Sequence, residues 1–436
     1  MPQATATALP VDSESFSLDD AAVVFYSRAH DVSLERAAEI SDWMAAVADP
    51  LSDLPTLTNT FADVRIVHGA SDEAPDLPRG DVRIELRVTE PEDPELEIAL
   101  AEIMSQRAGG RPVQLDLRRV PRTLAELDAI AAAEFARHEP SSVEAHYDFD
   151  AGEVTFSPAE GERPGFAWTS KCSNLAGGTM DGGRGILLSN PNLAGCFEAD
   201  ECTSGFPMRF AGTYGIATAG HCLDLYPKNS SGFVTNYTDR DTDLRYIYSY
   251  PTRYASTNAY WYRNPLDNNP IVDDGGYLRR VDASVGFPGR IWKYGADVWR
   301  NITAYEATFA PVGQTVCLSV SAASLSGAGE YCGEVIGPQT DHAGENALNA
   351  RQWTEIDFSA GDYKDYNGPA AGGSGAPVYW SGRVYGLYSS ADSCQGGLML
   401  CNTARYYRVD SLYWDMRAIT TDVHFICYPS TLCAMD

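Results

Sequence analysis

The chain has 436 residues, 44% of them hydrophobic and 21% charged, which is enough for two or three domains with sizeable cores. Its net charge of −28 at pH 7 would repel nucleic-acid phosphates and anionic lipids, and no run reaches the roughly 18 consecutive apolar residues of a membrane-spanning helix. Composition therefore argues against nucleic-acid binders and integral membrane proteins. We expect neither nucleic acid nor a membrane as a partner.

The cysteines divide the chain into two parts. All ten lie between Cys172 and Cys433, and charge follows the same division: residues 1–171 hold 33 acidic and 14 basic residues (−19), whereas residues 172–436 hold 27 and 18 (−9). An even number of cysteines without a C-x-x-C pair is typical of disulfides made in an oxidising compartment. We therefore expect a secreted protein, although no signal peptide is visible at the start of the chain.

The N-terminal part is predicted to be a small α+β segment over 19–161, after a disordered tail over 1–18. Apolar residues recur at a spacing of about 3.6 between Asp31 and Val47, which predicts a helix that Asp31 or Ser33 caps. Similar patterns predict four further elements: a strand over 82–88, a short alternating run over 113–117, a helix over 123–138, and a hairpin over 144–156 that turns at 150–152.

Four histidines fall in this segment without a nucleophile beside them: His30, His68, His138 and His146. We interpret each as a surface or packing residue. No group of histidine, cysteine or carboxylate residues in the chain has metal-ligand spacing, and no phosphate-binding glycine loop follows a strand. The sequence thus predicts no metal site and no cofactor.

Beyond a linker predicted over 162–171, the rest of the chain has the composition of an all-β domain. Short apolar runs alternate with turn residues at spacings of about ten residues, which is typical of a barrel or sandwich. Only residues 411–419 are predicted to form a helix. His342 lies in a polar segment and is interpreted as a solvated loop residue, whereas His424 is interpreted as a packed residue near a C-terminal disulfide.

Two short segments of this domain could carry chemistry. His221 lies in Thr-Ala-Gly-His-Cys (218–222), and Ser374 lies in Gly-Gly-Ser-Gly-Ala-Pro (372–377). A serine hydroxyl becomes a good nucleophile when an imidazole takes its proton, and the oxyanion that then forms needs backbone N–H donors nearby. Glycines beside Ser374 leave the backbone free to turn such donors inward.

These segments resemble the chymotrypsin-like serine peptidases, specifically the bacterial branch of streptogrisin and alpha-lytic protease, whose histidine lies in T-A-G-H-C and whose serine lies in G-D-S-G-G-P. Residues 385–390 resemble the strand that forms one wall of the substrate pocket in that branch. The resemblance implies an all-β, chymotrypsin-like double β-barrel peptidase domain over 172–436. It also implies that the α+β segment over 19–161 is a pro-region, an intramolecular partner of that domain.

The resemblance implies a role for each site residue. His221 would be the general base and Ser374 the nucleophile, with an oxyanion hole formed by the N–H groups of Gly372 and Ser374. The acid that orients His221 would be Asp243, which opens an alternating run that resembles a D-x-x-W strand start, and Asp282 is the second choice. The wall of the substrate pocket would contain three residues: Ser389, Ser390 and Ala391.

Two departures from the family pattern bear on activity. Gly373 stands where an aspartate normally precedes the serine, and Ser390 and Ala391 stand where two glycines are usual. The function we expect is a secreted serine endopeptidase, made as a precursor, that hydrolyses protein or peptide substrates through an acyl-enzyme. The alternative is a catalytically impaired peptidase-fold protein with a binding or scaffold role.

Five disulfides are expected from the ten cysteines. The resemblance implies two pairs: Cys202 with Cys222 and Cys317 with Cys332. Pairing of nearest neighbours adds three: Cys394 with Cys401, Cys427 with Cys433, and Cys172 with Cys196.

Overall fold

The computed structural model describes the chain in segments. The described residues are 16–18, 20–70, 74–105, 107–108, 111–135, 143–158, 181–183, 185–189, 200–219, 245–249, 252–257, 260–261, 275–279, 286–293, 298–306, 310–320, 329–336, 341–342, 353–358, 373–395 and 400–433. No helix within these segments is long and apolar enough to cross a membrane.

A closed barrel of six antiparallel strands lies in the second half of the chain. The strands follow the order β24-β23-β19-β20-β22-β25, the pairing of β24 with β25 closes the ring, and β18 joins β24 in parallel. Their bounds are β18 Ala304–Tyr305, β19 Thr315–Val320, β20 Gly329–Val335, β22 Trp353–Asp357, β23 Pro377–Trp380, β24 Arg383–Gln395 and β25 Leu400–Arg408. Fully buried Leu318, Val378 and Leu387 belong to its core, and the prediction of β structure is confirmed here.

Most of the remaining strands of this half form smaller sheets, in the orders β14-β15-β11-β10-β26-β27, β13-β12-β8-β9 and β16-β17. Their bounds are β8 Gly185–Ser189, β9 Asp200–Thr203, β10 Pro207–Phe210, β11 Thr213–Ala219, β12 Arg245–Ser249, β13 Thr252–Thr257, β14 Tyr260–Trp261, β15 Gly275–Arg279, β16 Arg290–Lys293, β17 Val298–Asn301, β26 Val423–Cys427 and β27 Thr431–Cys433. No pairing within the described segments closes the six-stranded sheet. The second barrel of the predicted pair therefore stays a prediction.

Aromatic side chains and one helix join this six-stranded sheet to the closed barrel. The ring of Tyr305 in β18 stacks on Phe425 in β26, with centroids 4.4 Å apart, and Phe206 meets Phe425 edge-on at 5.5 Å. The predicted C-terminal helix forms as α5 (Val409–Ile419), which leads from β25 to β26. α5 packs against β24, β25 and β26, and its buried Leu412 reaches β15, where a Cβ on Gly275 would lie 2.3 Å from Cδ1 of Leu412.

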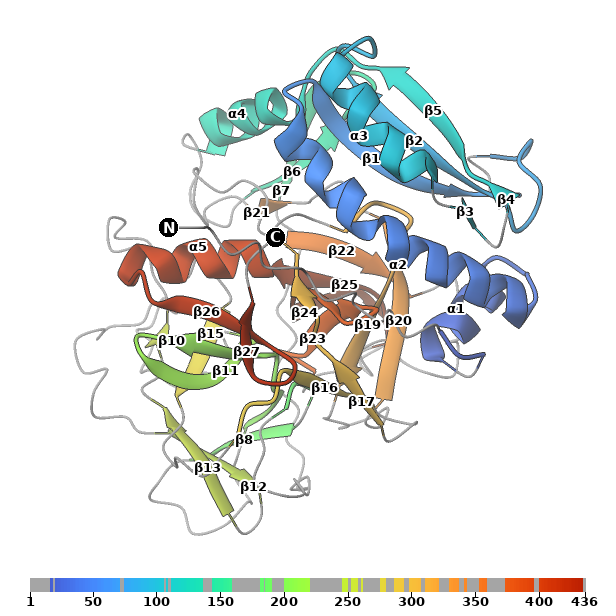
Figure 1. Cartoon of the computed structure of the whole chain (residues 1–436). Coiled ribbons are helices and arrows are strands. Elements are labelled where there is room, and N and C mark those ends of the chain that lie inside the picture. Colours follow the sequence, from blue (N-terminus) through green and yellow to red (C-terminus); the bar gives the residue numbers. More distant parts are fainter. Residues whose placement is uncertain are drawn as a thin grey trace, which may run out of the picture.

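Residues 16–158 form an α+β unit, the N-terminal unit, which is drawn above the barrel in Figure 1. Its central sheet has the order β1-β2-β5, with β1 antiparallel and β5 parallel to β2. The bounds are α1 Ala21–Ala29, α2 Leu34–Leu57, β1 Phe61–His68, β2 Val82–Val88, α3 Pro94–Ser105, β3 Arg107–Ala108, β4 Arg111–Pro112, β5 Gln114–Arg119, α4 Leu124–Phe135, β6 Val143–Asp148 and β7 Glu153–Pro158. The predicted strand over 82–88 and the hairpin are confirmed, whereas α1, β1 and α3 were not predicted.

Local capping explains where two of these helices begin. The hydroxyl oxygen of Ser33 accepts the N–H of Arg36 at 3.2 Å, so Ser33 is the cap of α2. At α4, the N–H of Thr123 donates to the Glu126 carboxylate (2.8 Å), and the N–H of Glu126 donates to the Thr123 hydroxyl (3.2 Å). This reciprocal pair satisfies two N–H groups at the start of the helix.

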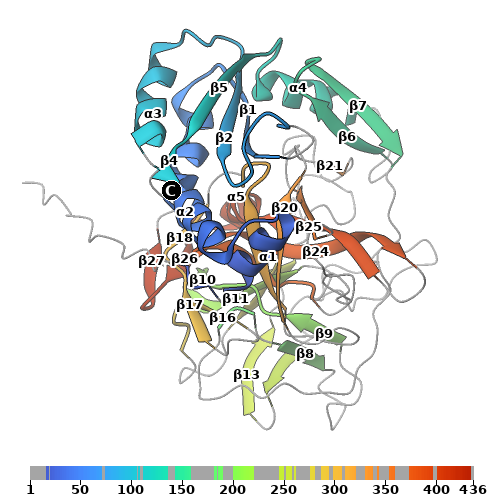
Figure 2. The ribbon, with the colours of Figure 1, turned by 90° about the vertical axis from the view of Figure 1, so that its right-hand side faces the viewer.

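Backbone pairing attaches the N-terminal unit to the second half of the chain. β21 (Asp341–His342) pairs with β6, so the β6-β7 hairpin extends into a three-stranded sheet (Figure 2). The N–H of Ile66 in β1 donates to the carbonyl oxygen of Val312 at 2.7 Å. Gly313 has φ +85°, and a Cβ there would lie 1.9 Å from the carbonyl oxygen of Ile66. His342, interpreted as a solvated loop residue, is therefore part of a paired strand.

Two of the predicted disulfides are present. Cys317 is bonded to Cys332 across β19 and β20, and Cys427 is bonded to Cys433 across β26 and β27. Each bond joins neighbouring antiparallel strands, so it fixes a pairing that the backbone already makes.

The other predicted disulfides are described in part. Cys394 lies opposite Cys401 in the β24–β25 pairing, the register that the predicted bond between them requires. Cys202 is disulfide-bonded. The remaining predicted partners lie outside the described residues: Cys222, Cys172 and Cys196.

Candidate active site

Ser374 lies in a tight turn that leads into β23 of the closed barrel. The N–H of Ala376 donates to the carbonyl oxygen of Gly373 (2.8 Å), and the N–H of Gly375 donates to the carbonyl oxygen of Tyr388 in β24 (2.7 Å). Ser374 is half-buried between the buried Gly373 and Gly375. The barrel thus fixes the backbone around Ser374 and leaves this residue partly accessible.

Strands outside the barrel hold the same turn from another side. The N–H of Thr203, at the end of β9, donates to the carbonyl oxygen of Ser374 (2.8 Å). Gly375 has φ +86°, and a Cβ there would lie 2.4 Å from the carbonyl oxygen of Thr203 and 2.8 Å from the backbone nitrogen of Ala219. Ala219 ends β11 two positions before His221. The segment with the predicted base therefore leaves its sheet against the turn with the predicted nucleophile.

The other predicted site residues are described in part. Ser389 is buried in β24, and the hydroxyl of Ser374 lies 3.5 Å from the Ser389 carbonyl oxygen, at the limit of a hydrogen bond. Ser390 and Ala391 follow in the same strand. Four candidates lie outside the described residues, and their positions stay predictions: His221, Asp243, Asp282 and Gly372.

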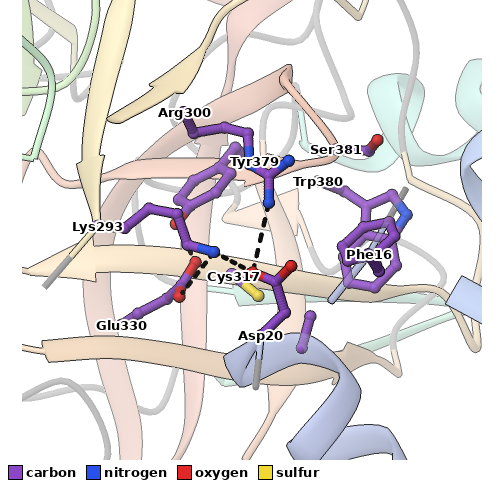
Figure 3. Close-up of a pocket in the computed structure, with 10 residues that line it drawn as sticks. Phe16, Asp20, Lys293, Arg300, Cys317, Glu330, Tyr379, Trp380 and Ser381 are labelled. Carbon is purple, nitrogen blue, oxygen red and sulfur yellow. Dashed lines mark hydrogen bonds and ion pairs between the residues drawn. The ribbon is translucent and has the colours of Figure 1, made fainter. Parts of the chain in front are cut away.

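A cluster of charged side chains is buried where the start of the N-terminal unit meets the barrel (Figure 3). The ammonium group of Lys293 pairs with Asp20 and lies 3.5 Å from Oε2 of Glu330. Nη2 of Arg300 lies 3.3 Å from Oδ1 of Asp20, and the Tyr379 hydroxyl donates to Glu330. Asp20 thus belongs to the N-terminal unit, whereas the other four side chains of the cluster belong to the second half of the chain.

The charges around Asp20 keep it ionised. Burial raises the pKa of Asp20, but the hydrogen bond from Lys293 and the charges of Lys293 and Arg300 outweigh it, so this pKa lies below its ordinary value of 3.8. Burial raises the pKa of Glu330 above its ordinary value of 4.5, although Lys293 opposes the change. Asp20 therefore keeps its ion pairs at neutral and mildly acidic pH.

The predicted disordered tail does not extend over Phe16. The Phe16 ring is buried and stacks on Trp380 in β23, with centroids 4.6 Å apart. The guanidinium of Arg300 lies 5.7 Å from the centroid of the Phe16 ring. The segment before α1 is thus attached to the strand that follows the Ser374 turn.

Two histidines of the N-terminal unit form a cluster that their positions in the sequence did not indicate. The rings of His30 and His68 have centroids 4.1 Å apart. Oε2 of Glu334, in β20, lies 3.2 Å from Nε2 of His30 and 4.0 Å from Nε2 of His68. The Tyr26 hydroxyl lies 2.6 Å from Nδ1 of His68. His30 and His68 are 38 positions apart, and Glu334 joins them only through the docking of the N-terminal unit, so no local spacing could show the cluster.

Comparisons with known proteins gave matches among solved structures alone. No protein-family model matches the chain, and no curated protein matches it. Solved structures similar to it include Nocardiopsis protease, at 18% identity and TM-score 0.33 over 55% of this chain and 97% of that one. An alpha-lytic protease homolog, N4, has 18% identity and TM-score 0.32 over 53% and 93%. An inactivated protease paralogue of the scabies mite has 14% identity and TM-score 0.30 over 55% and 94%.

Replacing Asp20 by asparagine should loosen the start of the N-terminal unit. The substitution leaves Lys293 and Arg300 buried without one of their counter-charges, which typically costs about 3 kcal/mol. We expect the opening free energy of α1, measured by amide hydrogen exchange of residues 21–29 in the full chain, to fall by about that amount.

The matched control is Asp422→Asn. The Asp422 pair with Arg209 has a similar distance of 3.3 Å, but both side chains are 32% exposed, so its loss should cost less than about 1 kcal/mol. Equal effects of the two substitutions on α1 exchange would contradict a special role of the buried cluster.

Proposed function

We propose that the protein is a secreted serine endopeptidase that hydrolyses protein or peptide substrates through a Ser-His-Asp triad and an acyl-enzyme. The observation that carries the proposal is the contact at Gly375. The turn with Ser374 packs against the end of β11, and His221 follows that end by two positions in the sequence. A nucleophile and its base must lie within hydrogen-bond reach, and this contact supports such a distance.

In the proposed mechanism, His221 takes the hydroxyl proton of Ser374 while Oγ attacks the scissile carbonyl carbon. The N–H groups of Gly372 and Ser374 stabilise the oxyanion, and Asp243 orients the imidazole and stabilises its protonated form. The imidazolium gives the proton to the leaving amine as the C–N bond breaks. Water then hydrolyses the acyl-enzyme, with His221 again as the base. The proposal needs no cofactor.

We further propose that residues 19–161 are a pro-region, joined by a linker over 162–171 to a peptidase domain over 172–436. Three contacts support docking of a preformed unit: the pairing of β21 with β6, the bond from Ile66 to Val312, and the ion pairs of Asp20. A barrel has many non-local strand pairings that form slowly, and a docked template lowers that barrier. The disulfides support export to an oxidising compartment.

Two departures from the family pattern favour the second candidate, a peptidase-fold protein with a binding or scaffold role. Gly373 cannot supply the carboxylate that stands before the serine in the family pattern, and the wall positions Ser390 and Ala391 differ from the usual glycines. A site with these changes can keep its fold and lose turnover. Kinetics of variants separate the two candidates.

Replacing Ser374 or His221 by alanine should lower kcat by about 10⁴-fold or more, because triad residues act as a unit. Asp243→Asn should cost on the order of 10³-fold, since the imidazole would lose its orienting partner. The measurement is hydrolysis of a denatured protein substrate and of short chromogenic peptides.

Two control variants accompany these three. His424→Ala, on β26, should keep near wild-type activity, and Asp282→Asn should have a mild effect. Near wild-type rates for Ser374→Ala or His221→Ala would overturn the serine-peptidase mechanism, and a large loss for Asp282→Asn alone would move the acid from Asp243 to Asp282. A wild type with no turnover on any substrate would favour the binding role.

The pro-region proposal predicts a dependence of folding on the N-terminal unit. Residues 166–436 expressed alone should refold with lower yield and rate than the same chain supplied with 1–165 as a separate polypeptide. A 1–165 polypeptide with Asp20→Asn should help less. Equal refolding of 166–436 with and without 1–165, by activity and by circular dichroism, would contradict the proposal.

A further inference from the structure

Three metal-ligand side chains converge between the N-terminal unit and the barrel. The ligand atoms of His30, His68 and Glu334 all lie within 4.8 Å of one another. His30 follows α1, His68 ends β1, and Glu334 lies in β20, so the three come from separate elements. Two imidazoles and one carboxylate form a donor set that zinc commonly takes in proteins.

The distances suit one tetrahedral ion. Bonds of about 2.0–2.1 Å at a tetrahedral ion place neighbouring ligand atoms about 3.3 Å apart. Nε2 of His30 and Oε2 of Glu334 lie 3.2 Å apart, which is that spacing. Nε2 of His68 lies 4.0 Å from the same oxygen, so it must approach that oxygen by less than about 1 Å to reach the same spacing.

The His30 nitrogen is a polar atom that a cation would satisfy. Nε2 of His30 is buried and makes no hydrogen bond, although Oε2 of Glu334 is 3.2 Å away, because the two are not aligned for one. A hydrogen bond would require an N–H group of His30 to point at the Glu334 oxygen. A tetrahedral ion lies off the line between two of its ligand atoms, so it can bind both atoms without that alignment. Burial also lowers the pKa of His30 to about 4, so its imidazole is neutral at pH 7.

Hydrogen-bond partners on both ring nitrogens of His68 decide how its ring could bind an ion. Its Nε2 lies 2.8 Å from the carbonyl oxygen of Gly313, which can only accept, so Nε2 carries the proton and Nδ1 accepts from the Tyr26 hydroxyl (2.6 Å). An ion on Nε2 requires the other tautomer, in which Nδ1–H donates to the Tyr26 oxygen. Such a bond orients the ring of a ligating histidine. An ion about 2.0–2.1 Å from Nε2 along the present direction of that bond would overlap the Gly313 carbonyl oxygen, so the His68 ring must also tilt away from it.

A second group of potential metal ligands in the described residues does not support a metal site. Cys317, Glu330 and Cys332 also lie close together, but the two sulfur atoms form a disulfide and offer no thiolate. The ligand atoms of His30, His68 and Glu334 are not tied up in a disulfide.

We propose that His30, His68 and Glu334 bind one divalent transition-metal ion, with zinc as the best chemical match, and that the ion fastens the N-terminal unit to the barrel. The site uses no residue of the Ser374 turn, so it does not depend on the proposed peptidase activity. An ion that binds the docked arrangement and not the separated parts stabilises docking by mass action.

The test is a titration of the metal-free full chain with Zn²⁺ against a chromophoric chelator, with Mg²⁺ as the hard-ion comparison. We expect one Zn²⁺ per chain with a Kd of about 10 µM or tighter, equivalent to at least about 7 kcal/mol, and no Mg²⁺ binding of that strength. His30→Gln and Glu334→Gln should each weaken Zn²⁺ binding by about 100-fold or more, since even outer-shell partners are worth 10 to 100-fold.

His424→Gln is the matched control. Its Nε2 also lies 3.3 Å from a carboxylate oxygen, that of Asp422, but in a half-exposed pair on β26, so the substitution should leave Zn²⁺ affinity unchanged. A second readout is amide exchange of residues 21–29 in α1, which Zn²⁺ should slow at least about tenfold in the wild type and not in Glu334→Gln.

The outcomes decide the proposal. Circular dichroism and thermal unfolding in metal-free buffer establish that the variants fold, and Glu334→Gln serves if His30→Gln does not fold. Absence of Zn²⁺ binding, equal binding by the wild type and both variants, or an exchange rate of α1 that Zn²⁺ does not change would overturn it.

Discussion

The turn that carries Ser374 can lie where it does only because residue 375 has no side chain. A Cβ on Gly375 would overlap the Thr203 carbonyl oxygen and the backbone nitrogen of Ala219, and the φ of +86° is itself costly for any other residue. Through this contact the closed barrel meets the sheet that contains β11. The arrangement proposed for the active site depends on it, because Ser374 lies in the turn of the barrel and the proposed base, His221, follows the end of β11 in the sequence.

The N-terminal unit is fastened to the second half of the chain by contacts with strict geometric requirements. Asp20 must meet Lys293 and Arg300, and Gly313 must accept the close approach of Ile66. Buried ion pairs add little net stability, since desolvation offsets much of their attraction, but a misplaced partner leaves a charge buried and is strongly penalised. Such contacts select one docked arrangement without making it permanent, which suits the role proposed for this unit, assistance in folding followed by release.

Local elements of the fold could be predicted because their signals are local. The strand over 82–88 alternates strictly, and the hairpin over 144–156 has a turn signal between two alternating runs, so both were found. β1 was missed because it is buried on both faces over most of its length and shows no alternation. The C-terminal disulfide and the helix α5 followed from neighbouring residues in the same way.

Long-range features of the chain could not be predicted so well. The motif around Ser374 indicated the candidate nucleophile, but the packing of Gly375 against Ala219 depends on the meeting of two sheets. The ion pairs of Asp20 with Lys293, and the contact of His30 with Glu334, join residues about 300 positions apart. Single-residue patterns carry no information on such pairs, because they form only after each part has folded.

The most direct test of the active-site assignment is the position of a covalent adduct with a small fluorophosphonate, which needs no knowledge of the natural substrate. The full chain is treated with the reagent, digested and mapped by mass spectrometry. Heat-unfolded protein is the control, because it keeps every serine but lacks the folded site. The account predicts one adduct, on the peptide that contains Ser374, in the folded protein only. A folded protein without that adduct, or with equal labelling after unfolding, would contradict the assignment of Ser374 as an activated nucleophile.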